Sequence, residues 1–185
     1  TSSPVLLNLP TTVRLLDDAS ALRFVATMMR VLGVDARTRR RGDTNVRFDG
    51  LAAFQSGRTA VIEIEFTANV VESPRALLED VAILHSRYGL ALPEIYPLSI
   101  VLALPNVRSE YYQVVQDIAN VLHLDIRTIT VGALAAILWH LGTLTTLDGL
   151  FLTAPGPTID LTPSIGAIIG TPVAEPYPAA FIPAK

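Results

Sequence analysis

The fold of the middle of the chain is decided by residues 46–66, which read VRFDGLAAFQSGRTAVIEIEF. Alternating and β-branched apolar residues flank a short Ser-Gly turn, a pattern typical of a β-hairpin. Residues i and i+2 of a strand share a face, so Glu63 and Glu65 point the same way. The hairpin brings Asp49 level with this pair, and three such carboxylates would repel one another if nothing compensated their charge. A divalent cation with oxygen ligands, Mg²⁺ or Mn²⁺, is the simplest compensation.

The same acidic pattern has a plainer interpretation. Acidic residues that alternate with Val and Ile often form the solvated face of an antiparallel sheet. The neighbouring segments, however, predict helices that cover the sheet. Residues 59–66 would then form a central strand, on which acidic side chains have little access to solvent and therefore need another partner. The spacing alone leaves both a metal site and a solvated face open.

Length and composition predict one globular domain. With 185 residues, half of them apolar and 17% charged, the chain can bury a sizeable core. It contains no cysteine, which excludes disulfides, thiolate zinc sites and iron–sulfur ligation. No signal peptide opens the sequence, and the longest apolar stretch, residues 131–141, is too short to cross a bilayer. We therefore expect a soluble, cytoplasmic protein without a membrane partner.

The charges are unevenly distributed along the chain. Residues 1–58 hold nine arginines against five acids, whereas residues 59–185 hold five basic and twelve acidic residues. A metal-dependent phosphodiesterase needs this polarity, with positive charge along the nucleic-acid backbone and carboxylates at the scissile phosphate. Arginine suits bidentate phosphate contacts, although a GC-rich coding bias would produce the same excess over lysine.

Hydrophobic periodicity, caps and glycine stops predict the other elements. In chain order they are a helix at 17–32, strands at 34–41, 46–54 and 59–67, a helix at 73–88, a strand at 97–104, a helix from 109 to 122, a strand at 126–130 and a buried helix at 131–141. A meander of strands followed by strand–helix alternation predicts an α/β fold, with a mixed central β-sheet and helices on both faces.

Residues 143–185 change character, since they hold seven of the thirteen prolines and only four formal charges. They are too apolar to remain exposed to solvent and too proline-rich to form helices or central strands. We therefore divide the chain into an α/β domain at 1–142 and an apolar arm at 143–185 that packs on its own domain or on a second subunit. We expect the arm to build a homodimer by burying Ile165, Ile168, Ile169, Phe181 and Ile182.

The element order αβββαβαβ, with an aspartate on the second strand and Glu-x-Glu on the third, resembles the PD-(D/E)xK nuclease superfamily, the restriction-endonuclease-like fold. The resemblance covers residues 17–142. The motif Phe48-Asp49-Gly50 lacks the family's proline. Glu65 stands where the family usually has lysine, as it does in a minority of type II restriction endonucleases.

The resemblance implies roles for individual residues. Asp49 and Glu63 would ligate Mg²⁺ or Mn²⁺, with the backbone carbonyl of Ile64 completing the protein ligands. Glu65 would orient or deprotonate the attacking water, or bind a second metal. The arginine-rich segment would offset phosphate charge through one or more of Arg37, Arg39, Arg40, Arg41 and Arg47.

These inferences predict a Mg²⁺-dependent DNA endonuclease, a small restriction-like enzyme. It would act as a homodimer because double-strand cleavage needs two sites and one chain supplies one. Two alternatives remain open at this point. One is a nuclease-fold module that binds nucleic acid or assembles with partners but has lost catalysis. The other is a structural interaction protein in which Glu63 and Glu65 are ordinary surface charges.

Overall fold

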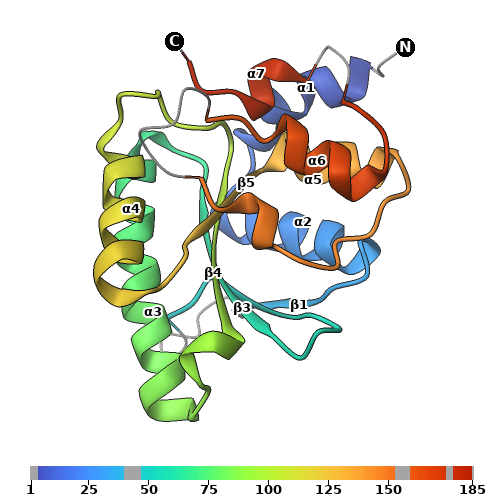
Figure 1. Cartoon of the computed structure of the whole chain (residues 1–185). Coiled ribbons are helices and arrows are strands. Elements are labelled where there is room, and N and C mark those ends of the chain that lie inside the picture. The colour runs from blue at the N-terminus through green and yellow to red at the C-terminus, as the bar shows by residue number, and fades with distance from the viewer. Residues whose placement is uncertain (1–3, 40–46, 153–158, 174–176, 185) are drawn as a thin grey trace.

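The computed structural model describes residues 4–39, 47–152, 159–173 and 177–184, and it places a five-stranded sheet between two layers of helices (Figure 1). The strands are β1 (Asp35–Thr38), β2 (Gly50–Ala53), β3 (Thr59–Glu65), β4 (Ile95–Val101) and β5 (Arg127–Thr130). The helices are α1 (Pro4–Val13), α2 (Asp18–Val31), α3 (Ser73–Tyr88), α4 (Glu110–Leu122), α5 (Val131–Trp139), α6 (Thr162–Ile169) and α7 (Pro178–Phe181), with 3₁₀ turns η1 (Ala68–Glu72), η2 (Leu92–Glu94) and η3 (Asp148–Leu150).

The strands lie in the sheet in their sequence order. β1, β2 and β3 form an antiparallel meander, and β3, β4 and β5 run parallel to one another. Helices α3 and α4 cover one face, and α2 and α5 lie on the other (Figure 1). The predicted α/β fold with a mixed sheet and helices on both faces is therefore confirmed.

Local sequence signals explain the helices that flank the site. Asp17 caps α2 by accepting a hydrogen bond from the Ser20 amide at 2.8 Å. Helix α3 has Pro74 in its first turn, where a missing N–H costs little, and ends at Gly89, whose φ of 73° suits glycine. All seven residues of β4 are buried because helices cover both faces of this central strand.

The C-terminal segment contains two helices, so the prediction that it is too proline-rich for helices is wrong. Pro163 lies in the first turn of α6, a position that tolerates proline, and Gly170 ends the helix. Helices α6 and α7 pack on α5 of the same chain. Their contact is close, because a Cβ added to Gly132 of α5 would lie 2.7 Å from the Cβ of Ala180.

The residues expected to build a dimer are largely used within the chain. Ile165 and Phe181 are fully buried, and Ile168 and Ile169 pack against the core, whereas Ile182 remains exposed. The arm at 143–185 thus lies on its own domain in the described ranges. The homodimer stays a prediction, without the support that we expected from this arm.

Helix α1 was not predicted, because Pro4 and Pro10 interrupt the local signal. An interior proline removes one helical hydrogen bond. The helix forms nevertheless where it packs on α5 and buries Val13. Tertiary packing therefore overrides a weak local propensity at this end of the chain.

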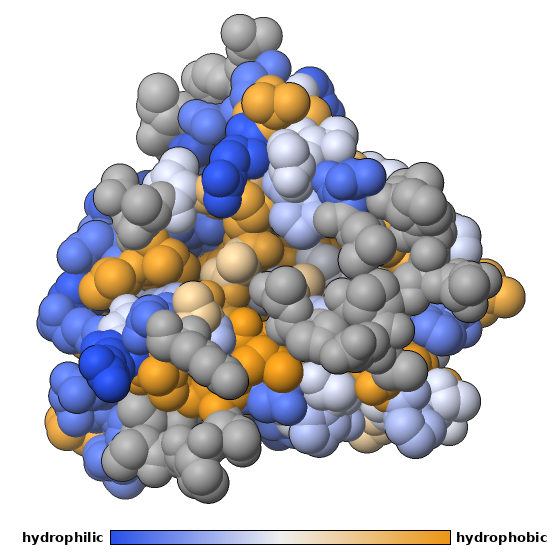
Figure 2. Space-filling model, turned by 90° about the horizontal axis from the view of Figure 1, so that it is seen from above, coloured by the Kyte–Doolittle hydropathy of each residue, from blue (hydrophilic) through white to orange (hydrophobic). Residues whose placement is uncertain are grey.

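Seen from above, the molecule shows a central band of apolar side chains surrounded by hydrophilic ones (Figure 2). Helices α1 and α7 lie at this end in Figure 1. Within the described ranges, no helix is both long enough and apolar enough to cross a bilayer.

Candidate functional site

A pocket of about 830 Å³ opens where the parallel strands β3 and β4 finish. Open α/β sheets bind ligands at this carboxyl end of their parallel strands. The charged lining of the pocket consists of four carboxylates and two guanidinium groups, from Asp18, Asp49, Glu63, Glu65, Arg14 and Arg39. The three predicted acids therefore share one pocket, together with Asp18 and Arg14, for which the sequence predicts no such role.

The hairpin register brings Asp49 to β3. Gly50 pairs with Ile62, so Asp49, one residue earlier, lies level with Glu63. Its carboxylate accepts a hydrogen bond from the Ile64 amide at 3.0 Å. The contact with Ile64 thus uses the amide N–H, and the ligand role of its carbonyl stays a prediction.

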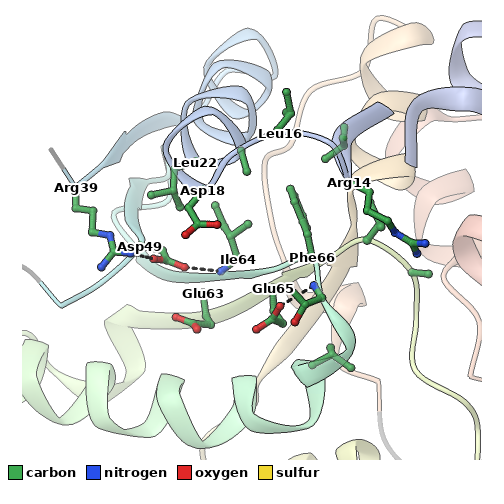
Figure 3. Close-up of a pocket in the computed structure, with 16 residues that line it drawn as sticks. Arg14, Leu16, Asp18, Leu22, Arg39, Asp49, Glu63, Ile64, Glu65 and Phe66 are labelled. Carbon is green, nitrogen blue, oxygen red and sulfur yellow. Dashed lines mark hydrogen bonds and ion pairs between the residues drawn. The ribbon is translucent and has the colours of Figure 1, made fainter. Parts of the chain in front are cut away.

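The two glutamates of β3 occupy the opposite side of the strand from Ile64. In Figure 3, Glu63 and Glu65 point toward α3, whereas Ile64 and Asp18 lie on the α2 side. Strand alternation produces this division, as the i, i+2 spacing predicts. Asp49 lies between the two sides, at the end of the sheet.

Glu63 combines burial with repulsion from neighbouring carboxylates. Burial and the neighbouring carboxylates of Asp49, Asp80 and Glu65 together raise the pKa of Glu63 to about 8. Burial likewise raises the pKa of Asp49, although its hydrogen bond from the Ile64 amide favours the charged form. At neutral pH Glu63 therefore retains a proton, the expected response of a carboxyl in a part-buried acidic cluster.

Asp80 on α3 is a further acid of this group that the sequence analysis did not identify. Its residue is 5% exposed, and no hydrogen bond to its carboxylate is found in the described part of the chain. Burial, with the charges of Asp49 and Glu79, raises the pKa of Asp80 to about 6. A sequence signal existed, since Asp80 interrupts the apolar stripe of Leu77 and Leu84 at helical spacing.

The three described arginines that the sequence predicts to bind phosphates lie apart from one another. Arg39 lines the pocket and lies 3.4 Å from a carboxylate oxygen of Asp49. Arg37 is exposed on the edge strand β1, where it pairs with an aspartate at 3.1 Å. Arg47 pairs with a glutamate of α3 at 2.6 Å. The other two lie outside the described residues: Arg40 and Arg41.

The donor set suits a hard divalent cation in charge and chemistry. Carboxylate oxygens are the ligands that Mg²⁺ and Mn²⁺ prefer, and a cation would replace the proton on Glu63. As they stand, however, no three acidic or histidine side chains of the described ranges converge closely enough to hold an ion. Glu65 instead accepts a hydrogen bond from the Thr67 amide at 2.7 Å. A shared ion therefore requires a glutamate side chain to rotate toward Asp49.

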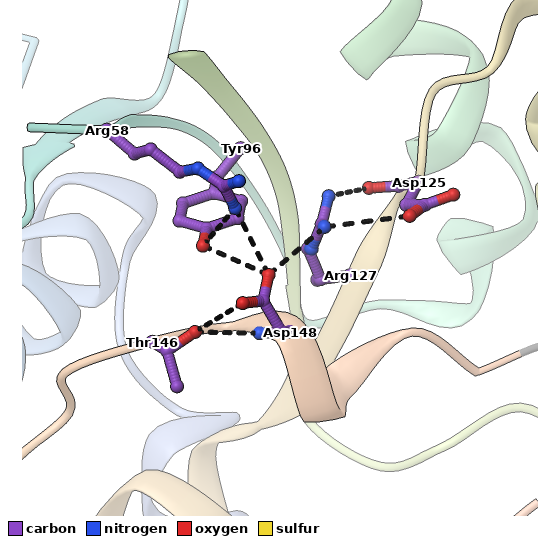
Figure 4. A network of polar contacts seen from close by, with 6 residues as sticks. All are labelled: Arg58, Tyr96, Asp125, Arg127, Thr146 and Asp148. Carbon is purple, nitrogen blue, oxygen red and sulfur yellow. Dashed lines mark hydrogen bonds and ion pairs between the residues drawn. The ribbon is translucent and has the colours of Figure 1, made fainter. Parts of the chain in front are cut away.

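A second polar cluster lies at the other end of the parallel strands, and its charges are paired (Figure 4). Asp148 of η3 accepts hydrogen bonds from Tyr96 at 3.0 Å, Thr146 at 3.0 Å and Arg58 at 3.2 Å. Arg127 lies 3.5 Å from the same carboxylate. The guanidinium carbons of Arg58 and Arg127 each lie 4.6 Å from the centre of the Tyr96 ring.

This second cluster attaches the C-terminal segment to the sheet. Asp148 belongs to that segment, whereas Arg58, Tyr96 and Arg127 lie where β3, β4 and β5 begin. Partial burial would raise the pKa of Asp148, but its hydrogen bonds and the two arginines together hold it below its ordinary value. The cluster is therefore suited to holding elements together, and the sequence contained no spacing signal that could have identified it.

Comparisons with models of protein families, with curated proteins and with solved structures find no match to this chain.

Proposed function

We propose that this protein is a Mg²⁺-dependent DNA endonuclease of the restriction-like kind, with its site at Asp49, Glu63 and Glu65. The observation that carries the proposal is the meeting of these three acids in one pocket at the carboxyl end of β3. Burial, together with repulsion from the neighbouring carboxylates, raises the pKa of Glu63 to about 8, so Glu63 keeps its proton at neutral pH, and a bound cation would favour its ionised form. The element order from α2 to β5 also agrees with the αβββαβαβ order that the resemblance implies.

The residues of the pocket divide the chemistry among them. Asp49 and Glu63 would hold the cation. When bound, Mg²⁺ supplies a water of lowered pKa and electrostatic stabilisation of the phosphate. Glu65 would accept the proton of the attacking water, because the lysine usual at this position is absent. Arg39, beside Asp49, would offset negative charge that develops on the phosphate.

The test is incubation of the purified full chain with supercoiled plasmid in Mg²⁺, in Mn²⁺ and in EDTA. We expect nicked and linear products with either metal and none in EDTA. Asp49→Asn should abolish cleavage. Asp117→Asn makes the same replacement at an exposed aspartate of α4 and should leave cleavage unchanged.

Absence of cleavage under every metal condition would overturn the proposal. Retention of DNA in a gel-shift assay would then indicate a binding module that has lost catalysis. Absence of both would favour a protein–protein interaction role.

The proposal includes a homodimer, because cutting both strands of a duplex requires two sites. Light scattering on the full chain measures this directly, and a dimer at micromolar concentration is expected. A version cut after Gly142 is not a useful comparison, because it would remove buried core residues such as Leu150, Ile165 and Phe181.

A further inference from the structure

Arg14 is a cation of the acidic pocket that the proposed chemistry does not use. It follows directly after α1, and its neighbour Val13 is buried in the core, which holds this part of the backbone in place. In Figure 3, Arg14 lies at the opposite end of the pocket from Arg39, with the predicted acids between them. The two guanidinium groups therefore flank the row of carboxylates.

The side chain of Arg14 is exposed and makes no ion pair or hydrogen bond that the described residues reveal. Most arginines whose structure is described have a carboxylate partner. Those that form ion pairs are Arg37, Arg39, Arg47, Arg58, Arg75 and Arg127. Arg14 thus lines a pocket with four carboxylates and pairs with none of them.

We propose that Arg14 binds a backbone phosphate of the nucleic-acid strand that crosses the pocket, next to the scissile phosphate on the side of Glu65. This inference rests on the proposed function. It adds the path of the nucleic-acid strand across the pocket, which would run from Arg39 to Arg14. A guanidinium group without an internal partner can donate two parallel hydrogen bonds to a phosphate group. It does not have to break an ion pair to do so.

The position also meets an electrostatic need of the site. With glutamate in place of lysine at residue 65, β3 brings no positive charge to the phosphate. Arg39 is already shared with Asp49. Arg14 is the other cation that lines the pocket within the described ranges, and it provides an unshared charge for the polyanion.

The experiment measures binding of a fluorescent 12-base-pair DNA duplex at several salt concentrations, with Ca²⁺ in place of Mg²⁺ so that the carboxylates have a cation. Wild type is compared with Arg14→Gln, Arg14→Lys and Arg87→Gln. Arg87 is an exposed arginine near the end of α3 that does not line the acidic pocket. Its replacement by glutamine changes the net charge by the same amount as Arg14→Gln. Thermal melting checks that each variant folds.

We expect Arg14→Gln to reduce the slope of log affinity against log salt by about one unit, the effect of one lost phosphate contact. Arg14→Lys should keep the slope, and Arg87→Gln should leave it unchanged. In cleavage assays Arg14→Gln should raise KM between about 3- and 10-fold, as for one charged hydrogen bond at a surface, and change kcat little.

The outcomes separate this inference from the proposed function. If wild type binds the duplex but does not cut plasmid, a reduced slope for Arg14→Gln still supports the phosphate contact. If wild type cuts and Arg14→Gln has the wild-type slope and KM, the role of Arg14 is wrong while the nuclease stands. Failure of wild type to bind the duplex overturns both.

Discussion

The two ends of the parallel strands carry polar clusters of opposite kinds. Where the strands begin, Arg58, Arg127 and Tyr96 all converge on Asp148, and charge is paired with charge. Where the strands finish, carboxylates gather with few cations, and the pKa of Glu63 rises to about 8. The ionisable groups of the sheet thus hold segments together at one end, whereas at the other end their negative charge is only partly compensated, by Arg39.

The difference shows which end is available for chemistry. A paired cluster has less to gain from a ligand, because most of its donors and acceptors already satisfy one another; among the buried side-chain atoms of the described residues, the Nε of Arg127 lacks a hydrogen-bond partner. An uncompensated acidic cluster reduces the stability of the folded state and is relieved by whatever brings positive charge. Groups with displaced pKa values in a pocket are therefore the better candidates for function, and three predictions test the contrast between the two clusters.

The largest effect is expected from Glu65. Glu65→Gln should lower the single-turnover rate of DNA cleavage by about 10²–10⁴, the contribution typical of a group that transfers a proton, while DNA affinity stays nearly constant. The matched change at the other end of the sheet is Asp148→Asn. Below the melting temperature of this variant, it should cleave DNA at the wild-type rate. Cleavage by Glu65→Gln as fast as wild type would remove Glu65 from the mechanism.

The second effect is a gain of stability at Glu63. The carboxyl has a pKa of about 8 in the folded protein against an ordinary value of 4.5, so the folded state binds more protons between these values. The stability of wild type should therefore fall as pH rises through this window. The full shift corresponds to about 4 kcal/mol at pH 8, and because Glu63 is only part-buried we expect about half of it: in EDTA, Glu63→Gln should raise the free energy of unfolding by about 2 kcal/mol at pH 8 and change it little at pH 5.

Urea unfolding at the two pH values measures this gain. Asp117→Asn, at an exposed aspartate of α4, serves as the control for replacing a carboxylate by an amide outside the acidic pocket. A loss of stability for Glu63→Gln at pH 8 would mean that the carboxylate is already neutralised within the folded chain.

The third and smallest effect is a loss of stability at Asp148. Asp148→Asn should lower the free energy of unfolding by about 1–2 kcal/mol at pH 7, because Tyr96 and the buried Arg127 lose a charged partner. The effect is no larger because the Asp148 side chain is itself largely exposed to solvent. The pKa of Asp148 is lowered, so this contribution is present above its ordinary value of 3.8 and is lost as pH falls below it.

Chemical denaturation of Asp148→Asn beside Asp35→Asn makes this comparison. Asp35 pairs with Arg37 on an open surface, so its replacement should change the free energy of unfolding by less than about 0.5 kcal/mol. Equal effects of the two substitutions would show that the cluster at Asp148 does not hold the C-terminal segment.

The sequence predicted the central part of the fold well, because its signals are local. The Ser-Gly hairpin, the Ser73-Pro74 helix start and the apolar run of β4 each depend on a few adjacent residues. From the hairpin register it also followed that Asp49 would lie near Glu63. These features could be predicted because turn chemistry and side-chain alternation determine them.

What escaped prediction depends on contacts between distant segments. Helices α1 and α6 contain or begin with prolines, and their stability comes from packing on α5. Asp80 enters the acidic group only because α3 crosses beside β3, although its position on an apolar stripe was a usable sign. The cluster around Asp148 joins residues up to 90 positions apart. The periodicity of a sequence indicates local structure and carries no sign of a contact between such distant residues.

Helix α5 is apolar on every side and touches helices that precede it in the chain, α1 and α2, as well as helices that follow it, α6 and α7. During synthesis it leaves the ribosome before residues 162–181 have emerged to cover it. The meander of β1, β2 and β3 can pair early because its contacts are local, whereas α5 has to stay exposed until translation has passed Phe181. The helix at the centre of the finished core is thus a segment whose apolar surface is fully covered only late in folding.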